Sequence, residues 1–375
     1  MPGARVGFIV NPLAGIGGRL GFKGSDGAYG LRALMEGAKP VSPLRARRFA
    51  AELDRIASSE GLELSIVAPP GIMGVDSLGG LRSVKVEVIS CVSPRLWPTT
   101  AHDTIRCARM MRDGGVDLIV FVGGDGTARN MCEAIGTEVP ALGVPSGVKV
   151  YSSVFAVNPE AAARVVALFS RGGGVRLEER QVVDVDEDEF RRGNLVIRFF
   201  CRLLTPIAGG VVEATKTPVA GSTVDDIAEY VASHLVEDCT LYILGPGSTV
   251  AAIAGKMGVP KSFLGVDAVH NGRLVGVDLS EKGILELLDK YKRAVVIVSP
   301  IGGQGFIFGR GNQQISPEIL RRVGRDNLLV VASPEKLKEL RVLRVDTGDP
   351  EVDEMLRGYI RVLVGYDRWR VMRVE

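Results

Sequence analysis

Residues 118–131 read LIVFVGGDGTARNM, and this stretch decides the fold. Five apolar residues come first, then Gly123-Gly124-Asp125-Gly126-Thr127, and then a segment of helical character. A strand, a glycine turn and a helix in succession build parallel sheets that are covered by helices. Backbone N–H groups at a helix N-terminus attract anions, and glycine lets the backbone approach a phosphate without a Cβ in the way. The carboxylate of Asp125 would repel a phosphate unless a metal ion or an acceptor hydroxyl lay between them, so it is the residue of interest in this loop.

Taken alone, a glycine-rich turn of this kind is equally well explained as an ordinary strand-to-helix connection in which Asp125 caps the helix. A second loop changes that balance, because the apolar residues 6–10 run into NPLAGIGGR at 11–19. In an open parallel sheet, the loops at the carboxyl ends of the strands share one edge, where ligands bind. Neither loop matches the P-loop or the dinucleotide-binding fingerprint, which disfavours a P-loop enzyme and a standard dehydrogenase.

The segments around these loops predict an α/β protein with two domains. Residues 1–160 are expected to form a Rossmann-like parallel-sheet domain, with strands at 6–11, 62–68, 84–90, 118–122 and 141–144 and helices at 45–59, 101–112 and 128–135. A helix expected at 159–170 spans the boundary. Residues 161–375 are expected to form a β-rich mixed α/β domain, with strands at 175–185, 194–204, 241–244, 263–269, 294–298 and 328–332. The last residues, 360–374, could add strands to either sheet.

Composition excludes several classes of function. The chain has 375 residues and a formal net charge of +2, so no strong field attracts nucleic acid or an anionic membrane. Its apolar runs are of strand length, far short of the roughly 20 residues that span a bilayer, and its start is too short for a signal peptide. We expect a cytoplasmic protein that binds neither nucleic acid nor membrane and forms a homo-oligomer. The five cysteines are scattered, with no C-x-x-C spacing, so neither a structural metal nor a disulfide framework is expected.

Several blocks together resemble the ATP-NAD kinases, in the branch found in archaea and bacteria, and more distantly the diacylglycerol and sphingosine kinases. The matching blocks span most of the chain: 11–27, GGDGTARN at 123–130, PSGVKVYSSVF at 145–155, GPGST at 245–249 and 299–316. The resemblance implies an N-terminal α/β domain, a β-rich C-terminal domain and ATP bound between them. It also implies that Asp125 is the catalytic group, acting as a base or through a metal ion.

The candidate site residues fall into two groups. The candidate phosphate-binding residues are Asn11, Gly15, Gly17, Gly18, Gly123, Gly124, Gly126 and Thr127. The candidate acceptor-binding residues are Ser146, Lys149, Gly247, Ser248, Thr249, Asp267, Gln304 and Asn312. Each has a plainer alternative: Lys149 as a surface lysine, Ser248 and Thr249 as helix caps, Asp267 as a turn residue, and the loop around Gln304 as a structural turn. Mg²⁺ is expected to be carried mainly by the ATP phosphates, without a dedicated ligand cluster.

Phosphoryl transfer needs alignment of donor and acceptor, neutralised phosphate charge and an oriented hydroxyl. The leading hypothesis is transfer of the terminal phosphate of ATP, or of polyphosphate, to the 2′-hydroxyl of NAD to give NADP. The chain contains no Asn-Glu dipeptide, a pair that holds NAD in the well-studied NAD kinases, so another hydroxylated metabolite is the alternative acceptor. A lipid kinase and a nucleotide-binding sensor without turnover are the remaining alternatives.

Overall fold

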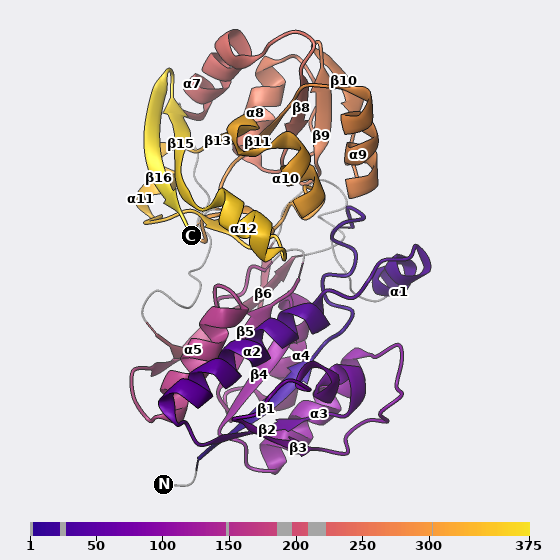
Figure 1. Cartoon of the computed structure of the whole chain (residues 1–375), viewed down its shortest axis with the longest axis vertical. Helices are drawn as coiled ribbons and strands as arrows, with labels where there is room; N and C mark the ends of the chain where they lie inside the picture. The colour runs from indigo at the N-terminus through magenta and orange to yellow at the C-terminus, as the bar shows by residue number, and fades with distance from the viewer. Residues whose placement is uncertain (1–2, 23–27, 148–149, 186–196, 209–222, 302) are drawn as a thin grey trace. The chain divides into compact units, whose positions relative to one another are not determined.

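The computed structural model describes residues 3–22, 28–147, 150–185, 197–208, 223–301 and 303–375 (Figure 1). The chain forms two compact units. Unit 1 comprises residues 1–16 and 24–215, and unit 2 comprises residues 17–23 and 216–375. The α/β class and the two kinds of domain are confirmed.

Unit 1 contains a five-stranded sheet in the order β3-β2-β1-β4-β5. Its strands are β1 (Ala4–Val10), β2 (Leu64–Ala68), β3 (Lys85–Val88), β4 (Leu118–Gly123) and β5 (Ala141–Pro145). Every neighbouring pair is parallel. All residues of β4 and β5 are buried, as expected for central strands covered on both faces. The strand order reverses between β1 and β4, and the two glycine loops follow these two strands.

Helices cover both faces of this sheet. They are α2 (Ser42–Glu60), α3 (Ala101–Asp113), α4 (Asp125–Ile135) and α5 (Pro159–Ser170), whereas α1 (Ala28–Met35) lies away from the sheet (Figure 1). Successive side chains of a strand point to opposite faces. Phe8 of β1 stacks on Phe49 of α2 with the ring centroids 5.4 Å apart, whereas the next residue, Ile9, packs in the core formed with α3 and α4. Helix α2 packs beside α5, and α3 beside α4.

Unit 1 also contains the hairpin of β6 (Arg176–Val185) and β7 (Ile197–Ile207). Both strands pack against α4, and β7 also contacts β5. The compact units therefore divide at 215/216, whereas the sequence placed the domain boundary after residue 160. The alternation of strand residues showed a change of texture but not which core the hairpin joins.

Two disulfides in unit 1 correct the expectation that the cysteines form none. Cys91 pairs with Cys107 of α3, with their Cα atoms 5.1 Å apart, and Cys132 of α4 pairs with Cys201 of β7 across 6.3 Å. Cys239 is a free, exposed cysteine. The cysteines lie 16 and 69 residues apart in sequence, so the fold and not a local motif brings them together. The second bridge ties the hairpin to the helix that follows the Asp125 loop.

Unit 2 contains a seven-stranded sheet in the order β10-β9-β8-β11-β13-β15-β16. Its strands are β8 (Leu241–Leu244), β9 (Asp267–His270), β10 (Arg273–Gly276), β11 (Ala294–Val298), β13 (Leu328–Val331), β15 (Gly358–Gly365) and β16 (Arg368–Val374). Strands β8, β11, β13 and β15 are parallel, and β9, β10 and β16 add antiparallel edges. The last two strands thus belong to the sheet of unit 2, which settles the open placement of residues 360–374. The short strands β12 (Phe306–Phe308) and β14 (Arg344–Val345) form a separate pair.

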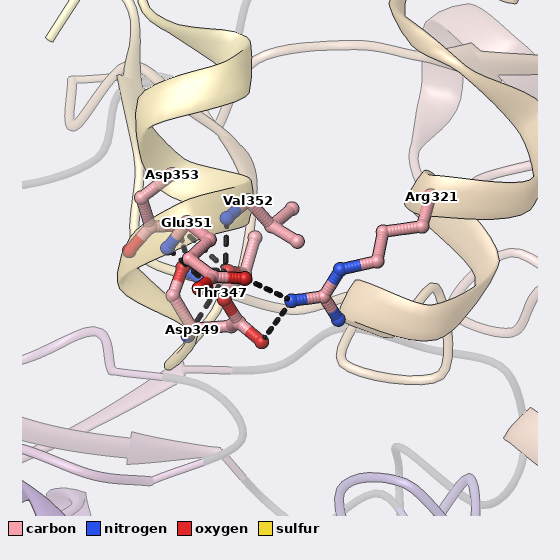
Figure 2. Close-up of polar contacts among 6 residues, drawn as sticks. All are labelled: Arg321, Thr347, Asp349, Glu351, Val352 and Asp353. Carbon is pink, nitrogen blue, oxygen red and sulfur yellow. Dashed lines mark hydrogen bonds and ion pairs between the residues drawn. The ribbon is translucent and has the colours of Figure 1, made fainter.

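Two hydrophobic cores cover the faces of this sheet. The helices are α7 (Thr223–Tyr230), α8 (Ser248–Lys256), α9 (Glu281–Lys290), α10 (Pro317–Val323), α11 (Pro334–Lys338) and α12 (Pro350–Leu356). One core joins the sheet to α7 and α8, and the other joins it to α9, α10 and α12. Polar contacts also connect α10 to α12: Arg321 donates to Asp349 at 2.7 Å, and Asp349 caps α12 by accepting from the Glu351 and Val352 N–H groups (Figure 2).

Candidate functional site

Three loops meet at the carboxyl edge of the unit 1 sheet, after β1, β4 and β5. The Asn11 N–H donates to the Val122 carbonyl at 3.0 Å, which places the end of β1 beside the end of β4. The Asn11 side chain then reaches the next loop, because its Nδ2 donates to Thr127 Oγ1 at 2.9 Å. Its Oδ1 accepts from the Leu13 N–H at 3.1 Å, which shapes its own loop. The two glycine loops therefore share one edge, as the sequence predicted.

Glycine is required where these loops approach each other. Gly15 has φ +75°, and a Cβ there would overlap the Ser146 carbonyl oxygen. A Cβ on Gly124 would lie 3.1 Å from the Gly147 Cα. The Ser146 N–H in turn donates to the Gly123 carbonyl at 2.8 Å. The close approach leaves backbone, not side chains, on the surface of this edge.

Ser42 is a site residue that sequence reasoning missed. Its buried hydroxyl donates to the Ala14 carbonyl at 2.8 Å and lies 2.7 Å from Ser146 Oγ. Since a hydroxyl has one proton, Ser146 must be the donor in the serine pair. The Ser146 hydroxyl keeps free lone pairs but no free proton. Only the position of Ser42 at the start of a helix could have drawn attention to it.

Asp125 is the first residue of α4, and its carboxylate is 5% exposed. One oxygen accepts from the Tyr151 N–H at 2.7 Å and the other from the Ser152 N–H at 2.9 Å. It does not cap its own helix, which was the plainer alternative. Burial is the largest influence on its acidity and raises the pKa of Asp125 to about 7, although both hydrogen bonds favour the charged form. The group can therefore gain and lose a proton near neutral pH.

Helix α4 begins without a side-chain cap. Gly124 is its N-cap, and the first turn contains Asp125, Gly126 and Thr127. The N–H groups of a first helical turn have no partner within the helix. Gly126 is half-buried, whereas the residues on either side of it are buried. The opening between the three loops thus presents backbone N–H groups and little side chain.

A third glycine loop follows β8 in unit 2. Helix α8 begins at Ser248, and its N-cap is Gly247, with φ +112° and no side-chain cap. The alternative that the Ser248 or Thr249 hydroxyl caps the helix is therefore wrong. Ser248 is exposed, whereas Thr249 is buried. The exposed hydroxyl of Ser248 is available at this edge of the sheet.

Asp267 lies beside this loop, because it pairs with Leu244 at the end of β8. Its side chain is fully buried, and it accepts from the Ser262 N–H and hydroxyl, both at 2.6 Å, and from the Asp278 N–H at 2.7 Å. Lys261 adds an ion pair at 3.2 Å. These contacts give Asp267 the role of joining two loops.

Gln304 and Asn312 lie in the loops around β12, and both are buried. Asn312 Nδ2 donates to the Ile307 carbonyl at 2.8 Å, while its Oδ1 accepts no hydrogen bond within the part of the chain that is described. Phe306 and Phe308 are 2% and 0% exposed, so these rings belong to the core and cannot stack on a ligand.

The remaining candidates lie elsewhere. Gly17 and Gly18 belong to the short segment of unit 2, where their carbonyls accept from the Phe22 and Gly21 N–H groups. Lys149 lies outside the described residues.

Lys336 is a second residue that the sequence did not single out. Its Nζ donates to Ser299 Oγ at 3.0 Å, and the two residues follow the neighbouring parallel strands β13 and β11. Burial lowers the pKa of Lys336 to about 8, and among the described residues no carboxylate pairs with it. Its position after a strand was the available signal, but lysine is common on surfaces.

The described residues show neither a metal-ligand cluster nor a membrane-spanning helix. They contain no group of three or more His, Cys, Asp or Glu side chains placed to hold a metal ion. No helix among them has the length and apolar character needed to cross a bilayer.

Comparison with known proteins gives two matches, which together cover most of the chain. The ATP-NAD kinase N-terminal domain model matches residues 6–174, and the ATP-NAD kinase C-terminal domain model matches residues 237–374. The searches of curated proteins and of solved structures found no match.

Proposed function

The chain belongs to the ATP-NAD kinase family, which phosphorylates NAD to NADP, and we propose that the three loops of unit 1 hold the ATP phosphates. The observation that carries this proposal is the convergence of the loops after β1, β4 and β5 at one edge. Asn11 joins the first two loops, and Ser42 joins the first to the third. Backbone N–H groups at the uncapped start of α4 supply the anion-binding surface.

Asp125 is the proposed catalytic group. In the transfer, an oxygen of the acceptor hydroxyl forms a bond to the terminal phosphorus of ATP, the bond to ADP breaks, and the hydroxyl proton must leave. Each carboxylate oxygen of Asp125 has accepted one N–H hydrogen bond and retains a further lone pair. A pKa near 7 suits a general base at neutral pH, since the group is then substantially ionised yet basic.

Magnesium is proposed to arrive with ATP. When bound, it would neutralise phosphate charge as the bond to ADP breaks. Mg²⁺ commonly binds through one or two carboxylates and the substrate phosphates, so a single carboxylate such as that of Asp125 fits this use. The protein's own part is to align the phosphates along the N-terminus of α4.

Acceptor-binding residues are proposed in each unit taken by itself: Ser146 and Lys149 in unit 1, and the loops that follow the strands in unit 2. Ser248 offers an exposed hydroxyl beside Gly247 and Thr249. Asn312 and Gln304 are buried, and they are proposed to shape the neighbouring loops. Ser146 can accept a hydrogen bond from a ribose hydroxyl. Asp267 is proposed to act through the loops that it joins.

Lys336 is proposed to neutralise a substrate phosphate. It is a half-buried cation at the carboxyl edge of the unit 2 sheet, and a bound anion would compensate for its lost hydration.

The test is to incubate the pure protein with ATP, Mg²⁺ and NAD and to measure NADP. A general base typically contributes about 100-fold to 10,000-fold in rate, so Asp125→Asn should lower kcat within that range while changing KM for ATP little. Asp54→Asn is the matched control, because Asp54 also accepts two backbone N–H hydrogen bonds, from Arg82 and Ser83, away from the site. Equal kcat for the two variants would contradict the catalytic role of Asp125.

Further arms of the assay address the donor and the assembly. Polyphosphate replaces ATP in one arm, and a panel of hydroxylated metabolites, assayed by release of ADP, replaces NAD in another. Release of ADP with another acceptor but not with NAD would support the alternative metabolite kinase. ATP binding without turnover on any acceptor would support a sensor. We propose a cytoplasmic homo-oligomer, which light scattering tests.

A further inference from the structure

Two adjoining cavities lie at the amino edge of the unit 2 sheet. Their volumes are about 350 Å³ and about 510 Å³, and Leu235, Tyr242, Val295 and Asn327 line both. The lining residues include the first residues of β11, β13 and β15, whereas the loop at Gly247 and the Lys336–Ser299 pair follow the opposite, carboxyl ends of the strands. The cavities are therefore separate from the unit 2 loops proposed to act on the acceptor. Their sizes lie within the roughly 300–1,000 Å³ of small-molecule sites.

The lining of these cavities is strongly basic. Five cationic side chains line them against two carboxylates, those of Glu237 and Asp326. Two of these cations are already paired: Arg293 with Glu237 at 3.0 Å, and Arg322 with Asp289 at 2.6 Å and with Glu318 at 3.0 Å. Lys292 and Arg325 form no ion pair among the described residues, and Arg325 only donates to the Tyr359 carbonyl at 2.9 Å. Since the whole chain has a net charge of +2, this local excess favours an anionic ligand.

Polar and aromatic groups divide between the two cavities. The smaller cavity is lined by Lys292, which is exposed, and by the buried residue Thr240. The larger cavity contains Trp369 and Tyr359, and the Tyr359 side chain is 72% exposed. The Trp369 ring is partly buried: it packs against the core of α7 and α8, and Arg361 lies over it, 4.5 Å from its centroid. The exposed aromatic ring of this cavity is that of Tyr359. One cavity thus suits phosphate groups, and the other suits a flat aromatic ring.

We propose that the two cavities form a second ligand site that binds a nucleotide. Its phosphates lie against Lys292 and Arg325, and its base lies against Tyr359 and Trp369. Cationic side chains recognise phosphate by charge-assisted hydrogen bonds, and aromatic faces recognise any base by stacking. A nucleotide held here is bound apart from the glycine loops that the kinase reaction uses, so the site does not depend on the proposed roles of those loops.

The test uses the fluorescence of Trp369. The chain has two tryptophans, so Trp97→Phe leaves Trp369 as the only one. ADP is the probe, because it has both a base and phosphates. The expected result is a saturable change in Trp369 fluorescence on addition of ADP, and at least a tenfold weaker response in Lys292→Ala/Arg325→Ala. Arg357→Ala is the matched control: it removes one cation that is paired with Glu354 and lines neither cavity.

The fluorescence titrations and the KM values together either support or overturn the proposed nucleotide site. Unchanged KM values for ATP and NAD in the double variant, with loss of the fluorescence response, support a separate nucleotide site. Equal ADP affinity in the double variant and the control overturns it, as does a parallel rise in KM for either substrate, which would make this a substrate site. Pyrophosphate that binds as tightly as ADP would overturn the aromatic part of the proposal. If the double variant unfolds, Lys292→Ala alone decides, because Lys292 is exposed.

Discussion

Asp125→Asn should change the pH dependence of stability in unit 1. Burial raises the pKa of Asp125 from its usual 3.8 to about 7. The folded state therefore holds this proton more tightly than the unfolded state, and the wild type loses stability as pH rises from about 4 to about 7. Since one pKa unit corresponds to about 1.4 kcal/mol, the loss above pH 7 is on the order of 4 kcal/mol. An asparagine does not ionise and escapes this loss.

The substitution also has a cost that does not depend on pH. Asparagine has one acceptor oxygen, so it can replace one of the two hydrogen bonds from Tyr151 and Ser152, and its NH₂ group then faces the other N–H. A buried N–H without a partner costs about 1–3 kcal/mol. Below about pH 4, where the carboxyl is protonated in both states, the variant should be less stable than the wild type by about this amount. At pH 5 the wild type has already lost roughly 1.7 kcal/mol, which offsets part of that deficit. At pH 8 it should be equally stable or more stable.

The assay is urea unfolding at pH 5, 6, 7 and 8, followed by circular dichroism. Because a chain with two units need not unfold in one step, hydrogen exchange at the Tyr151 and Ser152 amides gives the local free energy of opening. Asp54→Asn is again the control, since it makes the same chemical change at a partly exposed carboxylate. If the difference in unfolding free energy between Asp125→Asn and the wild type is the same at pH 5 and pH 8, the reasoning fails.

Three further predictions concern the loops, the half-buried lysine and the cysteines. Gly15→Ala should destabilise unit 1 by about 1–3 kcal/mol and reduce kcat/KM, because residue 15 has a positive φ and a Cβ there would overlap the Ser146 carbonyl oxygen. Gly37→Ala is the control, since Gly37 has φ +83° but lies in open space, so that only the backbone cost remains. Equal melting temperatures of the two variants would contradict the close approach at Gly15. Lys336→Met should raise the unfolding free energy at pH 7 by about 1–3 kcal/mol. The gain should shrink as pH rises from about 8 and vanish only above the unfolded pKa of 10.5, because the folded state disfavours the charged lysine, whose pKa is about 8. A gain that stays constant from pH 7 to pH 10 would refute this. Thiol titration of denatured protein should find one reactive thiol, Cys239, before reduction and five after it, and five before reduction would contradict both disulfides.

The sequence located the edge of the unit 1 site because two strong regularities coincide there. Apolar runs of strand length ended in glycines, and parallel strands bring such ends together. Strand β8 (Leu241–Leu244) and helix α5 (Pro159–Ser170) were predicted with their observed bounds for the same reason, since turn residues mark their ends. The spacing of apolar and turn residues along the chain is enough to predict these features.

Contacts between distant segments could not be predicted in this way. Nothing local shows that Asp125 accepts from the Tyr151 and Ser152 N–H groups, or that Cys132 lies beside Cys201. The boundary after residue 160 missed the packing of the hairpin on α4 for the same reason. These features depend on tertiary packing, which a pattern of apolar residues permits but does not specify.

The burial of Asp125 gives this residue two properties that have one cause. The side chain is surrounded by protein because it holds residues 151 and 152 against the loop, and the same burial raises its pKa toward neutrality. Removing the side chain would therefore disturb the geometry of the loop and the proton affinity together. A change of pH alters only the charge and leaves the covalent structure intact. A fall in kcat/KM below about pH 7 in the wild type that is absent from the residual activity of Asp125→Asn would assign the titrating group to Asp125, whereas an identical pH profile for both proteins would restrict this residue to positioning the loop.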